Sequence, residues 1–314
     1  MRNLVSCILD GRRRRRISIE DHELHRGTDV NEWTDKIRIL FEHAKLTWSD
    51  ANKMVVRDVY GMYHHRIPFH NHTHVYDVLQ MGVFLLVSCK AVFRKLSYDQ
   101  RFTFCIALLC HDIDHRGYTN SDIEKDSSVL ACMDDDTRSE RSTSSDLSLS
   151  SYCSSQSHNE KHHISKAGII LKRHGVTYDK HLFASLIAHT DLSRHQTFVD
   201  NMMNFDEQRS DIHNQLILLM KLADIGHILR PWNKHVYFVH AMNQERINPK
   251  DVCELPEDTL KFNEMFVYAL ICLIHKIDSP LYERLVTKFE TNKEIWNKIN
   301  DLYGVNLCRD IDPN

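Results

Sequence analysis

Apolar positions recur with helical spacing along most of the chain, from Val30 to Gly304. The clearest example places apolar side chains at i, i+4, i+7, i+8 and i+11, on one face of a helix: Trp33, Ile37, Leu40, Phe41 and Ala44. Further stretches with this spacing are 48–63, 162–172, 211–223 and 260–277. No proline occurs between Pro68 and Pro231, and no alternating strand pattern stands out. The pattern therefore predicts an all-α fold, a compact multi-helix domain.

Ser97 and Gln100 predict where another helix begins. A serine followed three residues later by glutamine forms a capping box, in which each side chain satisfies a backbone N–H of the first turn. The helix expected from this cap runs through Phe104 and Leu108 into His111.

Segment 134–158 interrupts the helical pattern with serine-rich sequence. Such a composition cannot bury enough apolar surface to order itself. We interpret the segment as a disordered insertion, not a domain boundary, because helical spacing resumes directly after it. The predicted organisation is a flexible basic tail over 1–30, a helical domain over 31–304 and a C-terminal tail over 305–314.

The N-terminal tail contains five consecutive arginines, from Arg12 to Arg16. A block of like charges is typical of a solvated, flexible segment. Two alternatives stay open. The sequence Arg-Arg-Ile-Ser resembles a basophilic kinase site, which would make Ser18 a phosphorylation site. The arginines could also contact anionic lipid weakly, helped by acylation of Cys7.

Composition narrows the class of protein. The net charge of −3 over 314 residues argues against a dedicated nucleic-acid binder. Nine cysteines, an odd number without a CxxC pair, indicate reduced thiols of an intracellular protein. No stretch reaches the roughly 18–20 apolar residues that span a bilayer, and the N-terminus lacks a secretory pattern. We therefore expect a cytoplasmic protein, with contact at the membrane periphery as the alternative.

The densest candidate chemistry lies in 109–117, where four ionisable side chains occupy five positions beside apolar residues: His111, Asp112, Asp114 and His115. Burying these groups is costly unless something neutralises them. A divalent metal would do so, and a mixture of imidazole and carboxylate suits a hydrolytic site better than a structural one.

Two other segments supply partners for this stretch. His70 and His74 stand at i and i+4, so on a helix they would share one face. One could bind a metal while the other stays free for acid–base work. Asp224 is a lone carboxylate within an apolar helical run and is the natural fourth ligand. Together His74, His111, Asp112 and Asp224 would give two nitrogen and two oxygen ligands, with room for water.

The order of these motifs resembles the catalytic domain of the class I cyclic-nucleotide phosphodiesterases, which are all-helical members of the HD superfamily. The resemblance covers roughly 33–302. It rests on four motifs in sequence order, which are His70-Asn71-x-x-His74, His111-Asp112-x-Asp114-His115-x-Gly117, Thr190-Asp191-Leu192-Ser193 and Ala223-Asp224-Ile225.

The resemblance implies hydrolysis of a cyclic nucleotide by two divalent metals. His74, His111, Asp112 and Asp224 match the ligands of the tightly held ion, usually Zn²⁺. Asp112 matches the bridge to a second ion, usually Mg²⁺ or Mn²⁺, and His70 matches the general acid that protonates the leaving O3′. The residues matching those that hold metal-bound waters are His115, Glu160, His163, Thr190 and Asp191.

The purine pocket departs from the family pattern, in which a glutamine bonds the base and a phenylalanine three residues later stacks on it. Counting back from Pro280 puts these roles at Leu270 and Leu273, whereas a gapped alignment puts them at Asn263 and Phe266. His227 stands where the family has an asparagine that faces the base. Asn71 completes the expected pocket. Preference for cAMP or cGMP therefore stays open, because base discrimination rests on paired hydrogen bonds.

Three functions remain at this stage. The first is hydrolysis of 3′,5′-cyclic nucleotides to 5′-monophosphates, which ends cyclic-nucleotide signalling. The second is an HD-type metallohydrolase acting on another phosphate ester. The third is a catalytically silent scaffold that keeps the fold, although four buried ligands would then serve no purpose. A homodimer is the one protein partner that we expect besides a kinase.

Overall fold

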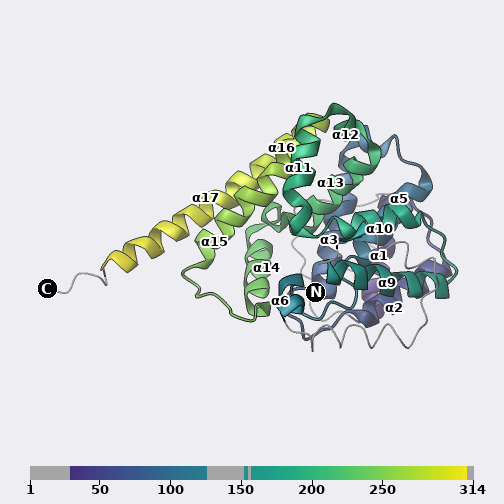
Figure 1. The fold of residues 1–314 in the computed structure, drawn as a ribbon, viewed down its shortest axis with the longest axis horizontal. Coiled ribbons are helices and arrows are strands. Elements are labelled where there is room, and N and C mark those ends of the chain that lie inside the picture. Colours follow the sequence, from purple (N-terminus) through teal and green to yellow (C-terminus); the bar gives the residue numbers. More distant parts are fainter. Residues whose placement is uncertain (1–28, 126–151, 155–156, 310–314) are drawn as a thin grey trace, which may run out of the picture.

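The computed structural model describes residues 29–125, 152–154 and 157–309, and these contain helices and turns but no strand (Figure 1). The first half comprises α1 (Val30–His43), α2 (Asp50–Met62), α3 (His72–Ser88), α4 (Lys90–Phe93), α5 (Tyr98–Cys110), α6 (Asn120–Lys125), α9 (His158–Arg173) and α10 (Lys180–Ala188). The second half comprises η2 (Leu192–Arg194), α11 (His195–Asn204), α12 (Asp206–Ser210), α13 (Ile212–Ile225), η3 (Gly226–Leu229), α14 (Trp232–Glu245), α15 (Leu255–Phe262), η4 (Asn263–Val267), α16 (Tyr268–Ile277) and α17 (Ser279–Arg309). The predicted all-α fold is confirmed.

Helix α3 forms the centre of the domain. Nearly every one of its side chains is buried, because α1, α5 and α13 pack around it (Figure 1). The sequence explains this position, since 75–86 is apolar on all sides of a helix apart from Asp77 and Gln80. The polar residues that lead into this helix are therefore held in a buried setting.

The apolar face predicted for the first helix is confirmed, since all five of its side chains are buried in the core. The capping box is confirmed as well. Ser97 Oγ accepts from Gln100 N over 3.1 Å, and the Gln100 side chain accepts from Ser97 N over 3.0 Å. The same helix, α5, ends at Cys110, so that His111 is its C-cap. The local sequence thus places His111 where the chain leaves the core.

The helix predicted over 260–277 is interrupted. A π-helical turn, η4, lies between α15 and α16, and it inserts an extra residue per turn. Side chains beyond the turn therefore point in other directions than a regular helix would give them. Helix α17 follows and projects beyond the body of the domain, with α14 and α15 lying along its base (Figure 1).

The ends of the predicted segments differ from the observed ones. His158 belongs to α9 and Ser157 is fully buried, so the final residues of the predicted insertion are ordered parts of the domain. Tyr152 and Cys153 also pack against the core. Helix α17 continues to Arg309, beyond the domain end predicted at 304. The rest of the insertion, the arginine run and Ser18 lie outside the described residues.

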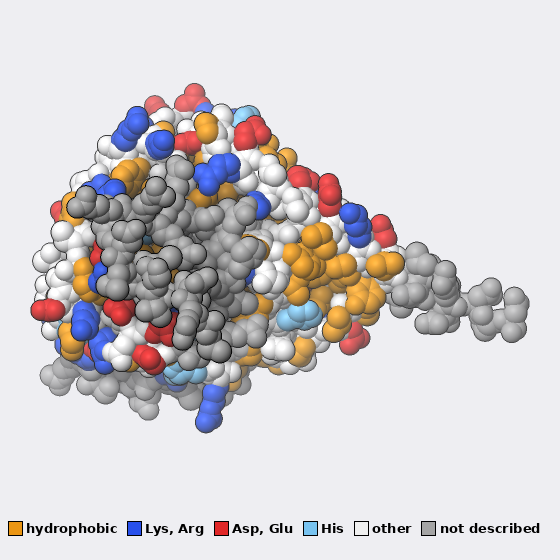
Figure 2. Space-filling view, turned by 180° about the vertical axis from the view of Figure 1, so that it is seen from behind, with side chains coloured by type: hydrophobic (Ala, Val, Ile, Leu, Met, Phe, Trp, Pro, Cys, Tyr) orange, Lys and Arg blue, Asp and Glu red, His pale blue; other side chains and the backbone are white. Residues whose placement is uncertain are grey.

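Apolar side chains gather beside the base of α17 (Figure 2). In the interior, Val239, Leu255 and Trp296 form a small buried cluster, with Trp232, Val236 and Ile299 packed against it. Within the described residues, no helix combines the length and the apolar character needed to cross a bilayer.

Candidate metal centre and catalytic cavity

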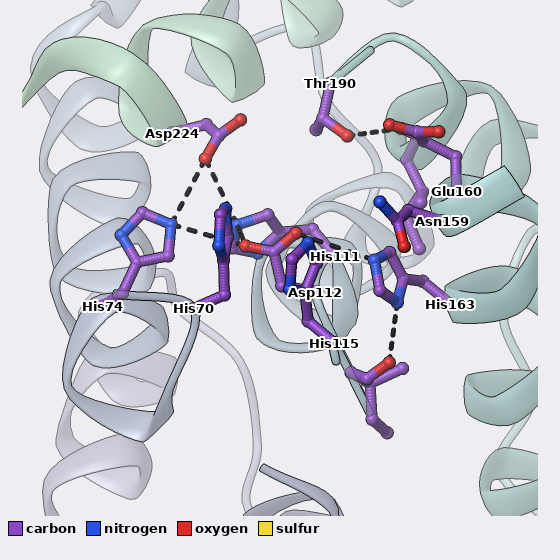
Figure 3. A network of polar contacts seen from close by, with 12 residues as sticks. His70, His74, His111, Asp112, His115, Asn159, Glu160, His163, Thr190 and Asp224 are labelled. Carbon is purple, nitrogen blue, oxygen red and sulfur yellow. Dashed lines mark hydrogen bonds and ion pairs between the residues drawn. The ribbon is translucent and has the colours of Figure 1, made fainter. Parts of the chain in front are cut away.

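Four side chains from three distant segments converge at one point. They are His74 on α3, His111 and Asp112 at the end of α5, and Asp224 near the end of α13. Each offers one ligand atom, and these four atoms all lie within 4.8 Å of one another. Figure 3 shows the two imidazoles and the two carboxylates pointing toward one another. The convergence predicted from sequence is therefore present.

The spacing of the ligand atoms fits a single ion. His111 Nε2 lies 3.0 Å from an Asp112 oxygen and 3.3 Å from an Asp224 oxygen, and His74 Nε2 lies 3.4 Å from each carboxylate. Ligand atoms that each lie about 2.1 Å from a common ion are about 3.0–3.4 Å apart in octahedral or tetrahedral geometry. The observed distances match that range.

The hydrogen bonding of the ring nitrogens of His74 and His111 is also compatible with a bound ion. Nδ1 of His111 donates to the Leu108 carbonyl over 2.9 Å, which leaves the lone pair of Nε2 for the cluster. The Nε2 atoms of His74 and His111 are buried and have no hydrogen-bond partner. An unpartnered buried nitrogen beside a carboxylate is costly, and a cation shared by all four residues would remove that cost.

Within the cluster, the pKa values of the histidines and the aspartates depend on one another's charges. Burial lowers the pKa of His111, but the nearby negative charges of Asp112 and Asp224 outweigh it and raise the pKa well above the usual value. Burial likewise raises the pKa of Asp224, yet His111 and His74 lower it to about 2. The carboxylates therefore stay ionised in a buried place, which requires positive charge beside them.

A turn with a left-handed backbone conformation at Asp114 orients the side chains next to it in the sequence. Asp114 has a φ of 59°, in the left-handed region that few residues other than glycine adopt. Its buried carboxylate contacts His64 at 2.7 Å, His162 at 2.9 Å and Arg116 at 3.2 Å. These partners offset the strain. Because of this turn, the Asp112 side chain lies in the four-residue cluster and the His115 side chain lies at the cavity.

Three of the residues expected to hold metal-bound waters, Glu160, His163 and Thr190, lie across from the cluster, in the right half of Figure 3. Nδ1 of His163 donates to the Ile113 carbonyl over 2.6 Å, which leaves Nε2 3.8 Å from Asp112. Burial raises the pKa of Glu160 to about 7, although a hydrogen bond from Asn120 opposes the shift.

Thr190 and Asp191 follow α10. The Thr190 hydroxyl donates to the Ile187 carbonyl over 2.8 Å, and Asp191 accepts from Ser193 N over 2.8 Å. Asp191 also accepts from the hydroxyl of Ser157. All the residues predicted to hold water, His115 included, line one cavity.

His70 lines this cavity, but it does not lie on the helix where it was predicted to lie. It precedes α3 and does not share a helical face with His74, because Asn71 caps the helix and α3 begins at His72. The two rings are nevertheless 5.9 Å apart between centroids. His70 stacks on His115 with a centroid distance of 3.8 Å. The helical-face prediction is wrong, while the closeness that it implied is correct.

Glu245, which the sequence analysis missed, holds His70 in place. One carboxylate oxygen contacts His70 Nδ1, and the other accepts the backbone N–H groups of Phe69 and His70 over 2.8 and 2.9 Å. His70, His115 and Glu245 also have ligand atoms within 4.8 Å of one another. We assign no metal to this group, because both Nδ1 atoms already have partners: that of His70 contacts Glu245, and that of His115 accepts from Gly117 N.

The cavity has a volume of about 620 Å³ and joins these groups. Asp112 and Asp224 of the four-residue cluster line it, together with His70, His227 and the residues predicted to hold water. Apolar side chains form another part of its wall: Phe69, Ile225, Met242 and Phe262. A small ligand with one charged and one flat apolar end would suit this lining.

The predicted nucleotide pocket needs correction. Leu270 and Leu273 are fully buried in the core. Asn263 donates to the Thr259 carbonyl, and Phe266 packs edge-on against His195 at 5.0 Å. Asn71 caps α3. Of the residues expected to contact the base, His227 lines the cavity, and Phe262 joins it in place of the others.

The fold and the cluster together define an all-helical domain in which two histidines and two aspartates that could hold a metal ion lie beside a cavity. Residues 69–295 match the family model described as 3′5′-cyclic nucleotide phosphodiesterase. Because the match covers more than half of the chain, the chain belongs to this family.

Individual relatives agree with this assignment. The chain is 28% identical over 264 residues to the cGMP-specific 3′,5′-cGMP phosphodiesterase 3 of Dictyostelium discoideum, covering 73% of this chain and 52% of that protein. It is 23% identical over 291 residues to the 3′,5′-cyclic-nucleotide phosphodiesterase regA of the same organism, covering 82% of this chain and 34% of that protein. The chain thus spans about half or less of the length of these relatives.

A solved structure shows the same fold. The phosphodiesterase domain of the RhoPDE fusion protein from the choanoflagellate Salpingoeca rosetta superposes with a TM-score of 0.71 at 19% sequence identity. The superposition covers 91% of this chain and 96% of that one.

Proposed function

We propose that this domain hydrolyses 3′,5′-cyclic nucleotides to 5′-nucleoside monophosphates. One observation carries the proposal: the buried His74, His111, Asp112 and Asp224 cluster opens into the same cavity as His70. A phosphodiester bound there would have metal ligands at one side and an imidazole at the other. The names of the relatives, all phosphodiesterases of cyclic nucleotides, support the same substrate class.

The cluster would hold two divalent ions. His74, His111, Asp112 and Asp224 would bind the first, for which two nitrogen and two oxygen ligands favour Zn²⁺. Asp112 would also serve the second, for which a carboxylate and waters favour Mg²⁺ or Mn²⁺. When bound, such ions lower the pKa of water and neutralise charge on a phosphate ester. Glu160, His163, Thr190, Asp191 and His115 line the space beside Asp112, where they can position water.

His70 would act as the general acid. Nδ1 of His70 donates to the Glu245 carboxylate, so the ring is fixed with Nε2 free for the cavity. The negative charge of Glu245 stabilises the protonated ring, which can then give a proton to the departing O3′. His115 lies flat against the opposite face of His70 and restricts its rotation.

The test is an assay of the purified protein with cAMP, cGMP and a panel of nucleoside triphosphates, together with metal analysis of the same sample. Turnover of a cyclic nucleotide and bound metal are expected. Turnover of another phosphate ester alone would favour the HD-type hydrolase, and a metal-free, inactive protein would favour the scaffold.

The remaining expectations about partners and location also stay proposals. They are phosphorylation at Ser18, weak lipid contact through Arg12 to Arg16, a homodimer and a cytoplasmic location. Phosphorylation and lipid contact concern segments outside the described residues. Sedimentation of the purified protein tests the dimer, and vesicle binding by an Arg12 to Arg16 alanine variant tests the lipid contact.

A further inference from the structure

A second cavity, of about 520 Å³, lies between α2, α9 and the turn that follows α5. Helices α2 and α9 pack side by side (Figure 1). Among the described residues, none lines both this α2–α9 cavity and the catalytic cavity, although Asp114 and Arg116 alternate along the turn with His115 and Gly117 of the catalytic cavity. The α2–α9 cavity is therefore a separate space beside the same turn.

Charged side chains make up most of the lining of the α2–α9 cavity. Four are cationic and two are carboxylates: Arg57, Arg116, Lys166, Arg173, Asp58 and Asp114. Four positive and two negative charges leave a surplus of two positive charges. Such a lining favours an anion over a cation or a neutral ligand.

The two carboxylates of the lining already have partners in the wall. The side chain of Asp114 is 3% exposed, and the two histidines and the arginine described above surround it. Oδ2 of Asp58 lies 2.8 Å from Nε2 of His174 and 3.3 Å from Arg173. The negative charges are therefore matched by groups of the wall, and the surplus positive charge lies on the remaining cations.

Lys166 and Arg57 are the cations with the weakest matching. The side chain of Lys166 is 13% exposed, and its ammonium lies 3.6 Å from Asp114, which is too far for a hydrogen bond. In the part of the chain that the structure describes, Lys166 has no other polar contact. Arg57 donates to the amide oxygen of Asn31 over 2.6 Å and forms no ion pair with a described carboxylate. A largely buried ammonium without an acceptor is costly, and a bound anion would remove that cost.

The rest of the lining indicates what kind of anion fits. Met62, Ile169 and Ile170 give the cavity an apolar part. Gly61 keeps the α2 side open, because an added Cβ would meet nothing within 4 Å. Arginine and lysine bind phosphate oxygens through charge-assisted hydrogen bonds. An anion with a phosphate head and a short organic stem would use both parts of the lining, as small-molecule ligands commonly do.

We propose that the α2–α9 cavity binds a phosphate monoester, with Lys166 and Arg57 at the phosphate and with Ile169 and Ile170 at the stem. The ester comes either from a small free molecule or from a phosphorylated side chain, because both present the same group. The site does not depend on the proposed function, since neither the four-residue cluster nor His70 takes part in it.

Two glycines make a test specific to the site. Gly61 lines the α2–α9 cavity and Gly117 lines the catalytic cavity. Their backbone amide signals in ¹H–¹⁵N spectra, assigned by their loss in Gly61→Ala and Gly117→Asn, report on the two cavities separately. The full chain is titrated with butyl phosphate, with N-acetylphosphoserine amide and with inorganic phosphate, and potassium chloride is the control for ionic strength.

We expect a phosphate monoester to move the Gly61 signal at a lower concentration than inorganic phosphate does, because only the ester contacts the apolar part of the lining. Potassium chloride should leave the signal in place. Tighter binding of butyl phosphate would identify a free ester as the source, and tighter binding of the phosphoserine compound would identify a phosphorylated side chain. Either result supports the site.

Charge variants test the role of Lys166. Lys166→Gln should raise the Kd read at Gly61 by about tenfold or more, because it removes a hydrogen bond between charged groups. Lys172→Gln is the matched control, since Lys172 lies on the same helix, is exposed and does not line the cavity. If Lys166→Gln fails to fold, Arg57→Gln tests the same loss of affinity from the other wall.

The inference is overturned if no probe moves the Gly61 signal, or if Lys166→Gln and Lys172→Gln have equal Kd values. It is also overturned if the Gly61 signal always follows the Gly117 signal at the same concentrations, because the anion would then bind in the catalytic cavity alone. A protein that hydrolyses no cyclic nucleotide but passes the Gly61 test would lose the proposed function and keep this site.

Discussion

Glu245 and His70 lie 175 positions apart in the sequence, yet one carboxylate fixes both the ring and the backbone of the histidine. One oxygen contacts Nδ1, and the other accepts the backbone N–H of His70 over 2.9 Å. Burial raises the pKa of Glu245, but the hydrogen bonds and charge of His70 outweigh it and leave the pKa below its usual value. The carboxylate is therefore ionised, and it favours a protonated His70.

We expect His70→Ala to lower kcat by about 10²- to 10⁴-fold, the range for loss of a general acid. The bound metal should stay, because His70 is not one of the four ligands. Parallel measurement of kcat and of zinc and magnesium content checks both statements. An unaltered kcat would remove His70 from the mechanism, and loss of metal would make it a ligand.

We expect Glu245→Gln to lower kcat by about 10- to 100-fold while the protein stays folded. The amide keeps the size of the carboxylate and can still accept a backbone N–H, but it no longer supplies the negative charge that favours a protonated His70. The pH profile of kcat gives the decisive readout, because a general acid loses activity as it deprotonates, so the alkaline limb of the profile should shift toward lower pH. A lower kcat with an unshifted profile would reduce Glu245 to a purely structural role.

Asp224→Ala should lose metal and thermal stability together. The variant removes one of four ligands and leaves His74, His111 and Asp112 buried without full compensation. Metal analysis and the thermal unfolding midpoint, each with and without a chelator, measure the two effects. Asp35→Ala is the control, because the side chain of Asp35 is 74% exposed and far from the cluster in sequence. Normal zinc retention by Asp224→Ala would refute the ligand assignment.

The sequence predicted that His74, His111, Asp112 and Asp224 would lie together, because each polar residue stands out locally from its apolar surroundings. His111 and Asp112 are adjacent polar residues at the end of an apolar helix, and Asp224 is a carboxylate in another. Such residues must find partners when they are buried. Glu245 gave no such signal, because a glutamate at the end of a surface helix is ordinary. Its importance comes from the packing of α14 beside the turn before α3, which no local pattern encodes.

Four residues predicted for the base pocket do not line the cavity, for a geometric reason. Counting back from Pro280 to Leu273 and Leu270 assumes one regular helix, and the alternative of Asn263 and Phe266 assumes a shift of that helix. The π-helical turn Asn263–Val267 breaks the register of both schemes. As a result Phe262, just before the turn, reaches the cavity. A π-helical turn depends on tertiary packing, so the spacing of apolar residues in the sequence does not reveal it.

A buried ion cluster on α3 should contribute strongly to stability. Asp77 lies 3.0 Å from Arg230 and 2.8 Å from Lys234, and all three side chains are buried. Removing one charge leaves the others buried without compensation, so Asp77→Asn should lower the free energy of unfolding by about 3–5 kcal/mol. Urea unfolding measures the change. Glu32→Gln, at the exposed Lys36 pair, should cost less than about 1 kcal/mol.

The same cluster predicts a pH dependence. Burial raises the pKa of Asp77, but the charges of Arg230 and Lys234 lower it to about 2. Because the folded-state pKa is lower than the unfolded one, this contribution is complete above the unfolded value of about 4 and is lost as pH falls toward 2. Between these two pH values the unaltered protein should lose more stability than Asp77→Asn. Parallel losses in the two proteins would show that other groups control acid unfolding.

The contact between α3 and α5 leaves no room for a methyl group at Gly82. A Cβ there would lie 2.7 Å from Cδ2 and 3.1 Å from Cγ of Leu108, a side chain that is fully buried and cannot swing away. Alanine gains about 1 kcal/mol of helix propensity over glycine. Overpacking costs about 1–3 kcal/mol or more, so we expect Gly82→Ala to lower the free energy of unfolding overall. Because α3 carries His74 and α5 leads into His111, metal retention should also weaken.

Gly61 offers the matched comparison. It lies near the end of α2, where an added Cβ meets nothing within 4 Å. Gly61→Ala therefore gains helix propensity without overpacking and should raise the free energy of unfolding by up to about 1 kcal/mol. Urea unfolding of both variants separates the two effects, because the amino-acid change is identical and the surroundings differ. If Gly82→Ala stabilises the protein as much as Gly61→Ala does, α3 and α5 are not in the close contact that holds His74 and His111 together.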